Sequence, residues 1–551
     1  MKQNFKLTLY RKVSAVSPPV ARLLFPRVAR YVAFVDSWGT IDSENQTYVP
    51  NLEYWFKAIQ TFENRYVSDK TWEDLDFDQI FLRIDSCVTS LGKQSLYNTL
   101  RTYRPEETLK SRFTDIGTLM AQTKFREAIQ MSLAKLEHEP SWNLIALLHG
   151  ETPPVPHSKL IILQSSLTVI VLLACFFSPT FIPVAVAMAA INFYVSIRMA
   201  DRVSRFMSGY SQLSSLLFCA VSLPKADTPA SIKVLDNLPY NKSTLYWLAQ
   251  RLRFFAVDRV GGAGVLNLFF HWMNIVALLD PLLYVRGTRI VGSNKTLLVD
   301  VLETISTVDE MISIANYLVA SEQICHPEMV EGNGIAFDKA YHPLLKNPVK
   351  NSATIDKQSL LIAGSNMAGK TTFIRTIGVN VILAQTVWFA HADGVRLGRF
   401  EVYTAIKRDD AILRGESYYF TELKLILNMI EKSSLDGPFL FLIDEIYRGT
   451  NTVERIAAST SVLEILSERQ TVMVTTHDVE LLDRLEGRYE LLHFEETGNP
   501  DEPFDFLVRP GRPLGRNAIK LLDRIGYPQK IVERALEIVS ELESKSGKQN
   551  W

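Results

Sequence analysis

The longest apolar stretch of the chain runs from Leu160 to Ile197 and contains no charged residue. Two helical segments, residues 160–177 and 180–197, flank the dipeptide Ser178-Pro179, which is suited to a turn. Each segment has about 18 residues and as a helix would be roughly 27 Å long, close to the hydrocarbon thickness of a bilayer. The pattern therefore predicts a transmembrane helical hairpin.

Basic residues flank this stretch on both sides, which predicts that both ends lie in the cytoplasm. We therefore expect the protein at the cytoplasmic membrane, with its C-terminal domain facing the cytoplasm. The alternative is a hairpin buried in the core of a soluble protein. A soluble helix usually keeps a polar face, and the stretch has too few polar residues to form one. The basic flanks are Lys159, Arg198, Arg202 and Arg205, and the polar residues considered are Gln164, Ser165, Ser166 and Asn192.

A third apolar stretch, residues 263–285, is predicted to be a core helix rather than another span. It contains His271 and Asp280, and Pro281 interrupts it. A third span would also place the two halves of the chain on opposite sides of the membrane.

Apolar residues recur at helical spacing from Trp72 to about Leu148 and again up to about Ser321. After that, short apolar strands alternate with helices, which is typical of a mostly parallel α/β sheet. The fold class is therefore α/β: a C-terminal domain with a mostly parallel sheet, preceded by an all-α domain that the hairpin interrupts. The expected parts are an irregular, aromatic-rich segment (1–70), two helical parts (71–157 and 201–340), the hairpin (158–200) and the C-terminal domain (341–551).

Charge and cysteine content change this picture little. The chain has 59 basic and 60 acidic residues, so its net charge points to no partner. Seven basic residues precede the first acidic one, Asp36, and such a start could be a solvated tail or contact anionic lipid or nucleic acid. Prolines in this segment argue against a signal peptide. Four scattered cysteines without a CxxC pair fit a reducing compartment and no zinc site.

A complete GxxxxGK[ST] motif follows the apolar strand "SLLIAG" and opens a helix, which is the setting that a phosphate-binding loop requires. Its glycines let backbone N–H groups approach phosphate, and the helix N-terminus adds positive potential. Lys370 would reach the β- and γ-phosphates, and the Thr371 hydroxyl would bind Mg²⁺. The predicted nucleotide-binding residues of the loop are Gly364, Ser365, Asn366, Met367, Ala368, Gly369, Lys370, Thr371 and Thr372.

Two further strands end in residues that complete this chemistry. The strand "FLFLID" ends in Asp444, suited to hold the Mg²⁺, and Glu445 follows as the residue that would polarise the attacking water. His477, after the strand "TVMVTT", could sense the γ-phosphate. No NKxD guanine signature is present, so the sequence favours ATP with Mg²⁺ over GTP.

Four segments together resemble the MutS family of ATPases, which belongs to the ABC-type ATPase class. They are "GSNMAGKTTFIRTIG", "DDAILRGESYYFTELK", "DEIYRGTN" and "TTHD", and "HPLL" at residues 342–345 resembles a further family motif. The resemblance covers most of residues 340–535. More weakly, "DQIFLRIDSCVTSLGKQSL" resembles the start of the family's helical lever domain.

The resemblance implies a homodimer formed through the ATPase domains. It implies that Ser417 and Glu422 face the partner subunit's ATP, with Ser417 taking part in catalysis. It also implies that the loop 448–451 communicates across the dimer, and that residues 517–536 form a C-terminal helix-turn-helix that braces it. An ordinary packed helical pair is the alternative for this last segment.

The chain also departs from the family pattern. Ala368 replaces a loop glycine and Thr371 replaces the commoner serine, although both still permit phosphate binding. No N-terminal mismatch-reading domain and no DNA clamp can be identified. The resemblance therefore implies an ATP-dependent, membrane-tethered protein that binds DNA in relation to mismatch repair or damage sensing. The alternative is a membrane-remodelling or membrane-signalling ATPase that has lost DNA binding, and a transporter ATPase is a weaker third possibility.

Overall fold

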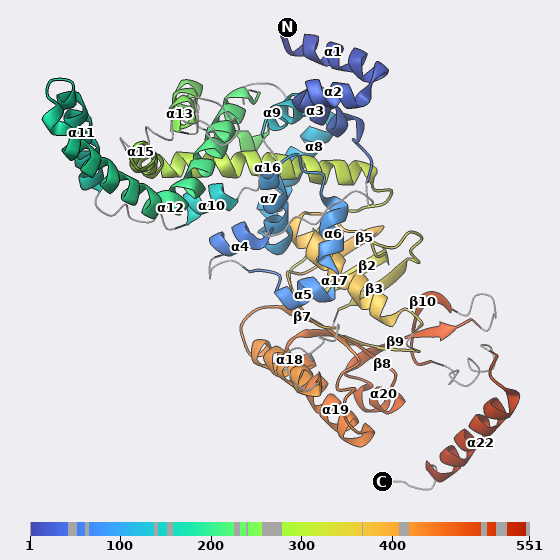
Figure 1. Ribbon diagram of the computed structural model, residues 1–551. Coiled ribbons are helices and arrows are strands. Elements are labelled where there is room, and N and C mark those ends of the chain that lie inside the picture. The colour runs from blue at the N-terminus through green and yellow to red at the C-terminus, as the bar shows by residue number, and fades with distance from the viewer. Residues whose placement is uncertain are drawn as a thin grey trace. The chain divides into compact units, whose positions relative to one another are not determined.

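The computed structural model of the chain is shown in Figure 1 and folds into two compact units. The first comprises residues 1–62, 82–99 and 110–321, and the second comprises residues 63–81, 100–109 and 322–551. The residues that the structure describes are 2–41, 52–60, 65–136, 142–150, 158–224, 232–238, 241–255, 278–356, 358–365, 367–406, 418–497, 504–513 and 526–546.

Helices make up the described part of the chain up to Ala320, as the periodicity from Trp72 onward predicts. They are α1 (Lys2–Val16), α2 (Pro18–Leu24), α3 (Pro26–Asp36), α4 (Glu53–Ile59), α5 (Asp69–Asp74), α6 (Phe77–Ile84), α7 (Ser90–Arg101), α8 (Glu106–Ala121), α9 (Thr123–Leu133), α10 (Trp142–His149), α11 (Ser158–Cys175), α12 (Ile182–Ser222), α13 (Lys242–Phe255), α15 (Leu279–Ser293) and α16 (Lys295–Ala320), with the short 3₁₀ turns η1 (Pro179–Phe181) and η2 (Lys233–Asn237).

The expectation of an irregular N-terminal segment is wrong for its described residues, because α1 to α4 form there. Two of the prolines in this segment begin helices. Pro18 is the first residue of α2 and Pro26 is the first residue of α3. Proline is favoured at this position, since its missing N–H has no partner inside the helix and its fixed φ suits a helix start.

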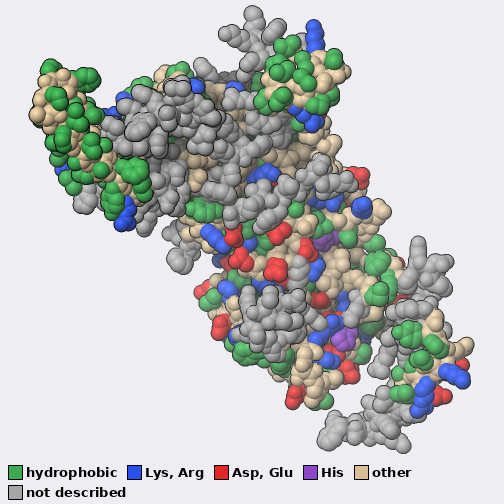
Figure 2. Space-filling view, viewed as in Figure 1, with side chains coloured by type: hydrophobic (Ala, Val, Ile, Leu, Met, Phe, Trp, Pro, Cys, Tyr) green, Lys and Arg blue, Asp and Glu red, His purple; other side chains and the backbone are tan. Residues whose placement is uncertain are grey.

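The apolar stretch forms a helical hairpin, with α11 and α12 joined at Ser178 and Pro179 as the sequence predicts. The second helix continues past the apolar stretch to Ser222. Both helices are long and apolar enough to cross a membrane, and only 17% and 11% of their apolar windows are buried. Figure 2 shows hydrophobic side chains over the outside of the hairpin. The other described residues therefore leave most of this surface uncovered.

Polar side chains of the hairpin meet between its two helices. The Gln164 side chain donates a hydrogen bond to Asn192 at 3.1 Å, and Asn192 donates one to Thr168 at 3.0 Å. Asn192 and Thr168 are fully buried. The polar groups thus satisfy one another internally, and the apolar side chains face outward.

Most of the third apolar stretch, residues 263–277, lies outside the described residues. Its described end forms the start of α15, where Leu283, Tyr284 and Val285 are buried. The core-helix prediction therefore remains untested for the greater part of the stretch.

The buried Asp309 of α16 ties this helix to the start of α7. Its carboxylate accepts hydrogen bonds from the backbone N–H groups of Val88 and Thr89 and from the Thr89 hydroxyl, at 2.7–3.0 Å. Burial raises the pKa of the Asp309 carboxyl to about 6, although these hydrogen bonds act in the opposite direction. Gly92 lies against the same side chain, and a Cβ atom there would be 2.2 Å from Asp309 Oδ2.

The second unit is built on a six-stranded sheet with the order β10-β9-β4-β8-β7-β6, in which all neighbours are parallel except β10 and β9. The mostly parallel sheet that the sequence predicts is thus present. Its central strands are buried along their length, as their continuous apolar sequence requires. The strands are β4 (Ser359–Ala363), β6 (Glu401–Ala405), β7 (Phe439–Asp444), β8 (Thr471–Thr476), β9 (Tyr489–Glu496) and β10 (Phe504–Pro510).

Helices cover both faces of this sheet. Leu442 of β7 faces Gly378 of α17 (Lys370–Thr386), where a Cβ atom would be 2.5 Å from the leucine side chain. The neighbouring residues Phe441 and Ile443 point to the opposite face and join one apolar cluster with α18 (Tyr418–Ser433), α19 (Thr452–Arg469) and α20 (Val479–Leu485). This layering leaves the carboxyl ends of the parallel strands open at one edge.

The sequence did not predict a second, four-stranded sheet with the order β1-β5-β2-β3. Its strands are β1 (Pro327–Met329), β2 (Ile335–Ala340), β3 (Asn351–Ile355) and β5 (Gly394–Leu397). Of the expected C-terminal helix-turn-helix (517–536), residues 517–525 lie outside the described residues. Its last part, residues 529–536, begins α22 (Gln529–Ser546).

We expect Gly92→Ala to lower the midpoint of thermal unfolding, because the new methyl group would displace a carboxylate held by three hydrogen bonds. Overpacking of this kind costs about 1–3 kcal/mol. Gly117→Ala is the matched control, since it also lies in a helix and has no neighbouring atom within 4 Å. This control should be slightly stabilising, by about 0.5–1 kcal/mol. Equal midpoints for the two variants would contradict the assigned contact.

Candidate nucleotide site at the carboxyl edge of the sheet

The predicted phosphate loop connects β4 to α17 at the carboxyl edge of the six-stranded sheet. Gly364 and Gly369 have φ values of +143° and +101°, in the region that favours glycine. A Cβ atom on Gly364 would be 2.9 Å from the Phe494 carbonyl oxygen, and one on Gly369 would be 3.2 Å from the Phe506 ring. The loop therefore needs glycine at both positions.

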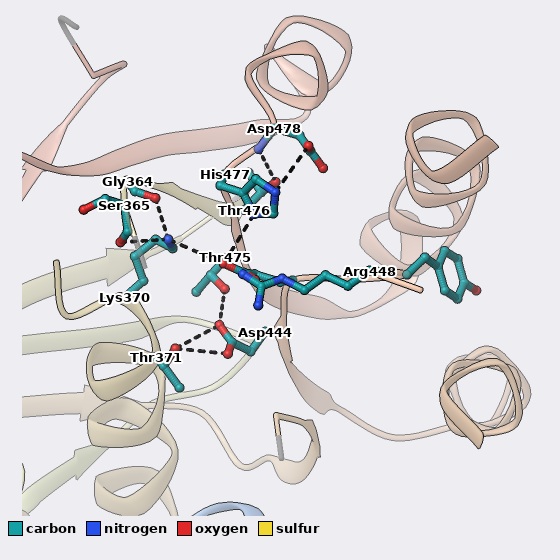
Figure 3. Close-up of polar contacts among 12 residues, drawn as sticks. Gly364, Ser365, Lys370, Thr371, Asp444, Arg448, Thr475, Thr476, His477 and Asp478 are labelled. Atoms are coloured by element: carbon teal, nitrogen blue, oxygen red, sulfur yellow. Dashed lines mark hydrogen bonds and ion pairs between the residues drawn. The ribbon is translucent and has the colours of Figure 1, made fainter. Parts of the chain in front are cut away.

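Lys370, the first residue of α17, is buried and folds back over the loop (Figure 3). Its ammonium group donates hydrogen bonds to the carbonyl oxygens of Gly364 and Ser365, the latter at 3.0 Å. Burial lowers the pKa of the Lys370 ammonium to about 8, and the nearby Asp444 partly opposes this shift. The lysine is thus positioned at the centre of the loop.

Asp444, at the end of β7, connects the loop helix to two strands. Its carboxylate accepts hydrogen bonds from the Thr371 hydroxyl at 3.0 and 3.1 Å and from the Thr475 hydroxyl. Thr371 lies on α17 and Thr475 on β8, which pairs with β7 in parallel. Figure 3 shows these three side chains converging beside Lys370. The predicted magnesium ligands Thr371 and Asp444 are therefore in direct contact.

Glu445 follows Asp444 with a φ of +54°, which is unusual for a residue other than glycine. Its side chain is almost fully buried and lies beside two cationic groups and an imidazole. The carboxylate forms an ion pair with Arg448, lies 3.7 Å from the Lys370 ammonium and is 3.4 Å from His477 Nδ1. Its charge is thus compensated inside the site, and strained backbone geometry of this type is typical of functional residues.

His477 follows β8 and completes the group of predicted residues. Burial lowers the pKa of its imidazole, while the neighbouring Asp478 partly opposes the shift. Asp478 is itself fixed by a two-pronged ion pair with Arg455 of α19, at 2.7 and 3.1 Å. A largely neutral imidazole facing Glu445 can exchange hydrogen bonds with phosphate or water at neutral pH.

A cavity of about 400 Å³ adjoins the loop on the side of α17 that faces β10. Phe373 and Phe494 pack edge to face on its wall, with ring centroids 5.8 Å apart. Further lining residues are His342 and Leu345 of the "HPLL" motif, Lys346, Asn347, Val349, Asn351, Met367, Gly369, Thr371, Thr372, Thr376, Ala340 and Phe506. Aromatic and apolar walls next to a phosphate loop suit a nucleotide base.

Two predicted site residues, Asn366 and Ser417, lie outside the described residues. Glu422 lies on α18, where its carboxylate accepts a hydrogen bond from the Tyr447 backbone N–H at 2.6 Å. The loop 448–451 ends at Asn451, whose side chain caps α19. The remaining predicted residues, Met367, Ala368 and Thr372 among them, lie on the loop and the first turn of α17.

Sequence reasoning missed three contributors to the site. Thr475 belongs to the recognised motif "TTHD", but the sequence predicted no role for it. Phe494 and Phe506 lie on β9 and β10, more than 120 residues after the loop. The only sequence signal for these two aromatic residues is that they lie in apolar segments typical of strands. Their proximity to the loop follows from the strand order β10-β9-β4.

The residues present fit a magnesium-bound nucleotide. The Ser365 hydroxyl is buried in the loop and has no hydrogen-bond partner among the described residues, so a phosphate oxygen would satisfy it. The hydroxyl and carboxylate oxygens of Thr371 and Asp444 are the hard ligands that Mg²⁺ prefers.

Comparison with known proteins identifies this part of the chain. Residues 360–543 match the family model described as MutS domain V. The chain is 30% identical to the DNA mismatch repair protein MutS of Aquifex pyrophilus over 271 residues, and 33% identical to that of Leptospira interrogans over 263 residues. It is 28% identical to the DNA mismatch repair protein MutS 1 of Halobacterium salinarum over 268 residues. The matched regions cover 44–47% of this chain but only 30% of each relative.

We expect Lys370→Ala and Glu445→Gln to impair the site in different ways. Loss of Lys370 should weaken ATP binding by about 1.5–3 kcal/mol, since a hydrogen bond to a charged group is lost. Glu445→Gln should retain ATP binding but slow hydrolysis about 10²–10⁴-fold, the usual contribution of a general base. Binding of a fluorescent ATP analogue and release of phosphate measure the two effects. Equal loss of nucleotide binding in both variants would refute the assigned roles.

Proposed function

Because the C-terminal half of this chain makes it a member of the MutS family, we propose that it is a membrane-tethered, MutS-type ATPase. The convergence of Lys370, Thr371, Asp444 and Glu445 at one edge of the sheet is the observation that carries this proposal. We assign the C-terminal domain to the P-loop, ABC-type ATPases and take ATP as its substrate and Mg²⁺ as its cofactor.

In this proposal Lys370 and the loop N–H groups hold the phosphates, and the cavity beside Phe494 holds the base. Thr371 and Asp444 would hold Mg²⁺, which when bound neutralises charge on the phosphates. Glu445 accepts a proton from the attacking water, and His477 hydrogen-bonds near the γ-phosphate. Arg448 pairs with the Glu445 carboxylate and keeps it in the site. When phosphate is bound, Lys370 and Arg448 would pair with it instead and leave Glu445 available to the water.

We further propose that two copies of the chain pair through their ATPase domains. Ser417 of one subunit would then complete the catalytic site of the other. Exposed apolar side chains on α18 and α19 are available for such an interface, which would remove them from water. They are Phe420, Leu427 and Val453.

The first candidate role is ATP-dependent DNA binding related to mismatch repair or DNA damage sensing. Its support is the similarity to relatives named as DNA mismatch repair proteins. The similarity is confined to 30% of their length, so no residues for reading a mismatch are assigned. The protein would act at the cytoplasmic membrane, with the ATPase domain facing the cytoplasm.

The second candidate role is membrane remodelling or membrane signalling without DNA binding. The exposed apolar surface of the hairpin favours it, because ATP-driven movement would then act on the bilayer.

DNA binding and its dependence on salt distinguish the two roles. Duplex, mismatched and branched DNA should bind and stimulate ATPase activity with steep salt dependence if DNA is the partner. Absence of binding at low salt would leave the membrane role.

We expect the full chain to sediment with membranes and to require detergent for extraction. Replacing residues 166–190 by a short flexible linker should release it from membranes of neutral lipid while basal ATPase activity persists. This replacement keeps Ile161 and Val195, which pack against α15. A full-length protein that stays in solution after high-speed centrifugation without detergent would contradict the membrane assignment.

A further inference from the structure

The first two helices present an apolar outer face that the other described residues leave exposed. Their inner face is anchored, since Tyr10 of α1 and Ala21 of α2 are buried. On the outer face, Val16 is 88% exposed and Leu23 is 81% exposed. Together with Leu9, Val20 and Leu24, which are also exposed, these residues define what we call the N-terminal surface.

This surface is basic as well as apolar. Arg11, Lys12 and Arg22 are exposed on the same two helices, and no acidic residue occurs before Asp36. Figure 2 shows hydrophobic and basic side chains side by side in this region. The two helices pack on each other and on α3, which in turn packs on α9, and Arg126 of α9 stacks on Trp38 after α3 at 3.6 Å. The surface is therefore a fixed feature of the unit.

We propose that the N-terminal surface binds the surface of an anionic lipid bilayer. An interfacial helix places apolar side chains at the boundary between headgroups and acyl chains, while Lys and Arg contact anionic headgroups. The exposed residues of α1 and α2 provide both parts. Nucleic acid would satisfy the basic side chains, but its phosphate backbone would leave Val16, Leu23 and Leu24 exposed to water.

This surface is separate from the hairpin and has a different role. The hairpin is charge-free and suited to the bilayer interior, whereas the N-terminal surface combines charge with apolar side chains and is suited to the interface. It makes the attachment of the first unit dependent on lipid charge, which a hairpin alone would not. The proposal does not depend on the ATPase assignment.

Amide hydrogen exchange of the full chain in lipid nanodiscs tests this inference. Discs of phosphatidylcholine alone are compared with discs that also contain phosphatidylglycerol. Each basic side chain near an anionic membrane strengthens binding about fivefold. Because the surface carries several such side chains, amide hydrogen exchange of residues 9–24 should slow at least about tenfold in the anionic discs. Leu23→Asp/Leu24→Asp should remove this slowing, and the control Leu23→Ile/Leu24→Ile should retain it.

Unchanged exchange of both variants in neutral discs shows that the helices remain folded. If the chain proves soluble without detergent, the hairpin assignment has failed, and the same exchange measurement is made with added phosphatidylglycerol vesicles instead of discs. The N-terminal surface is then tested independently of the hairpin. Equal exchange of the unmodified chain with neutral and anionic lipid would overturn the proposal. Slowing of these amides by duplex DNA in neutral discs would also overturn it, in favour of a nucleic-acid surface.

Discussion

The hydrogen bonds of the Asp444 carboxylate determine the geometry of the nucleotide site. They join α17, β7 and β8, three segments that lie far apart in the sequence, at the carboxyl edge of one sheet. Because β7 and β8 are parallel, the residues that follow them, Glu445 and His477, reach the same edge. The loop lysine starts the helix that carries Thr371. Every proposed catalytic group that the structure describes therefore lies on or next to one of the three segments that meet at this contact.

Charge compensation is the second constraint on the site. A buried carboxylate without a partner is costly, and Glu445 is stabilised by Arg448 and Lys370. The lowered pKa of Lys370 shows that its own burial opposes its charge. Phosphate would replace carbonyl oxygens as the lysine's partner and so strengthen its charged form. In the proposed function, binding of phosphate by Lys370 would weaken its ion pair with Glu445.

The sequence could predict those features that depend on local pattern. The loop, the buried strands and the hairpin turn at Pro179 follow from short motifs and periodicity, and the structure contains them. Features that depend on distant contacts were missed. Phe494 and Phe506 lie next to the phosphate loop only because β9 and β10 are placed beside β4 in the sheet. The four-stranded sheet combines β1, β2 and β3, which precede the phosphate loop in the sequence, with β5, which follows it. Helix formation around Pro18 was also missed, because proline favours a helix start as well as a break.

We propose that Thr371 and Asp444 are the magnesium ligands of an ATP site. Equilibrium binding of ATP with and without Mg²⁺ should be compared between the unmodified chain and Asp444→Asn. We expect Mg²⁺ to strengthen ATP binding to the unmodified chain, and this gain should be lost in the variant while metal-free binding persists. An equal gain from Mg²⁺ in both proteins would show that Asp444 does not bind the metal.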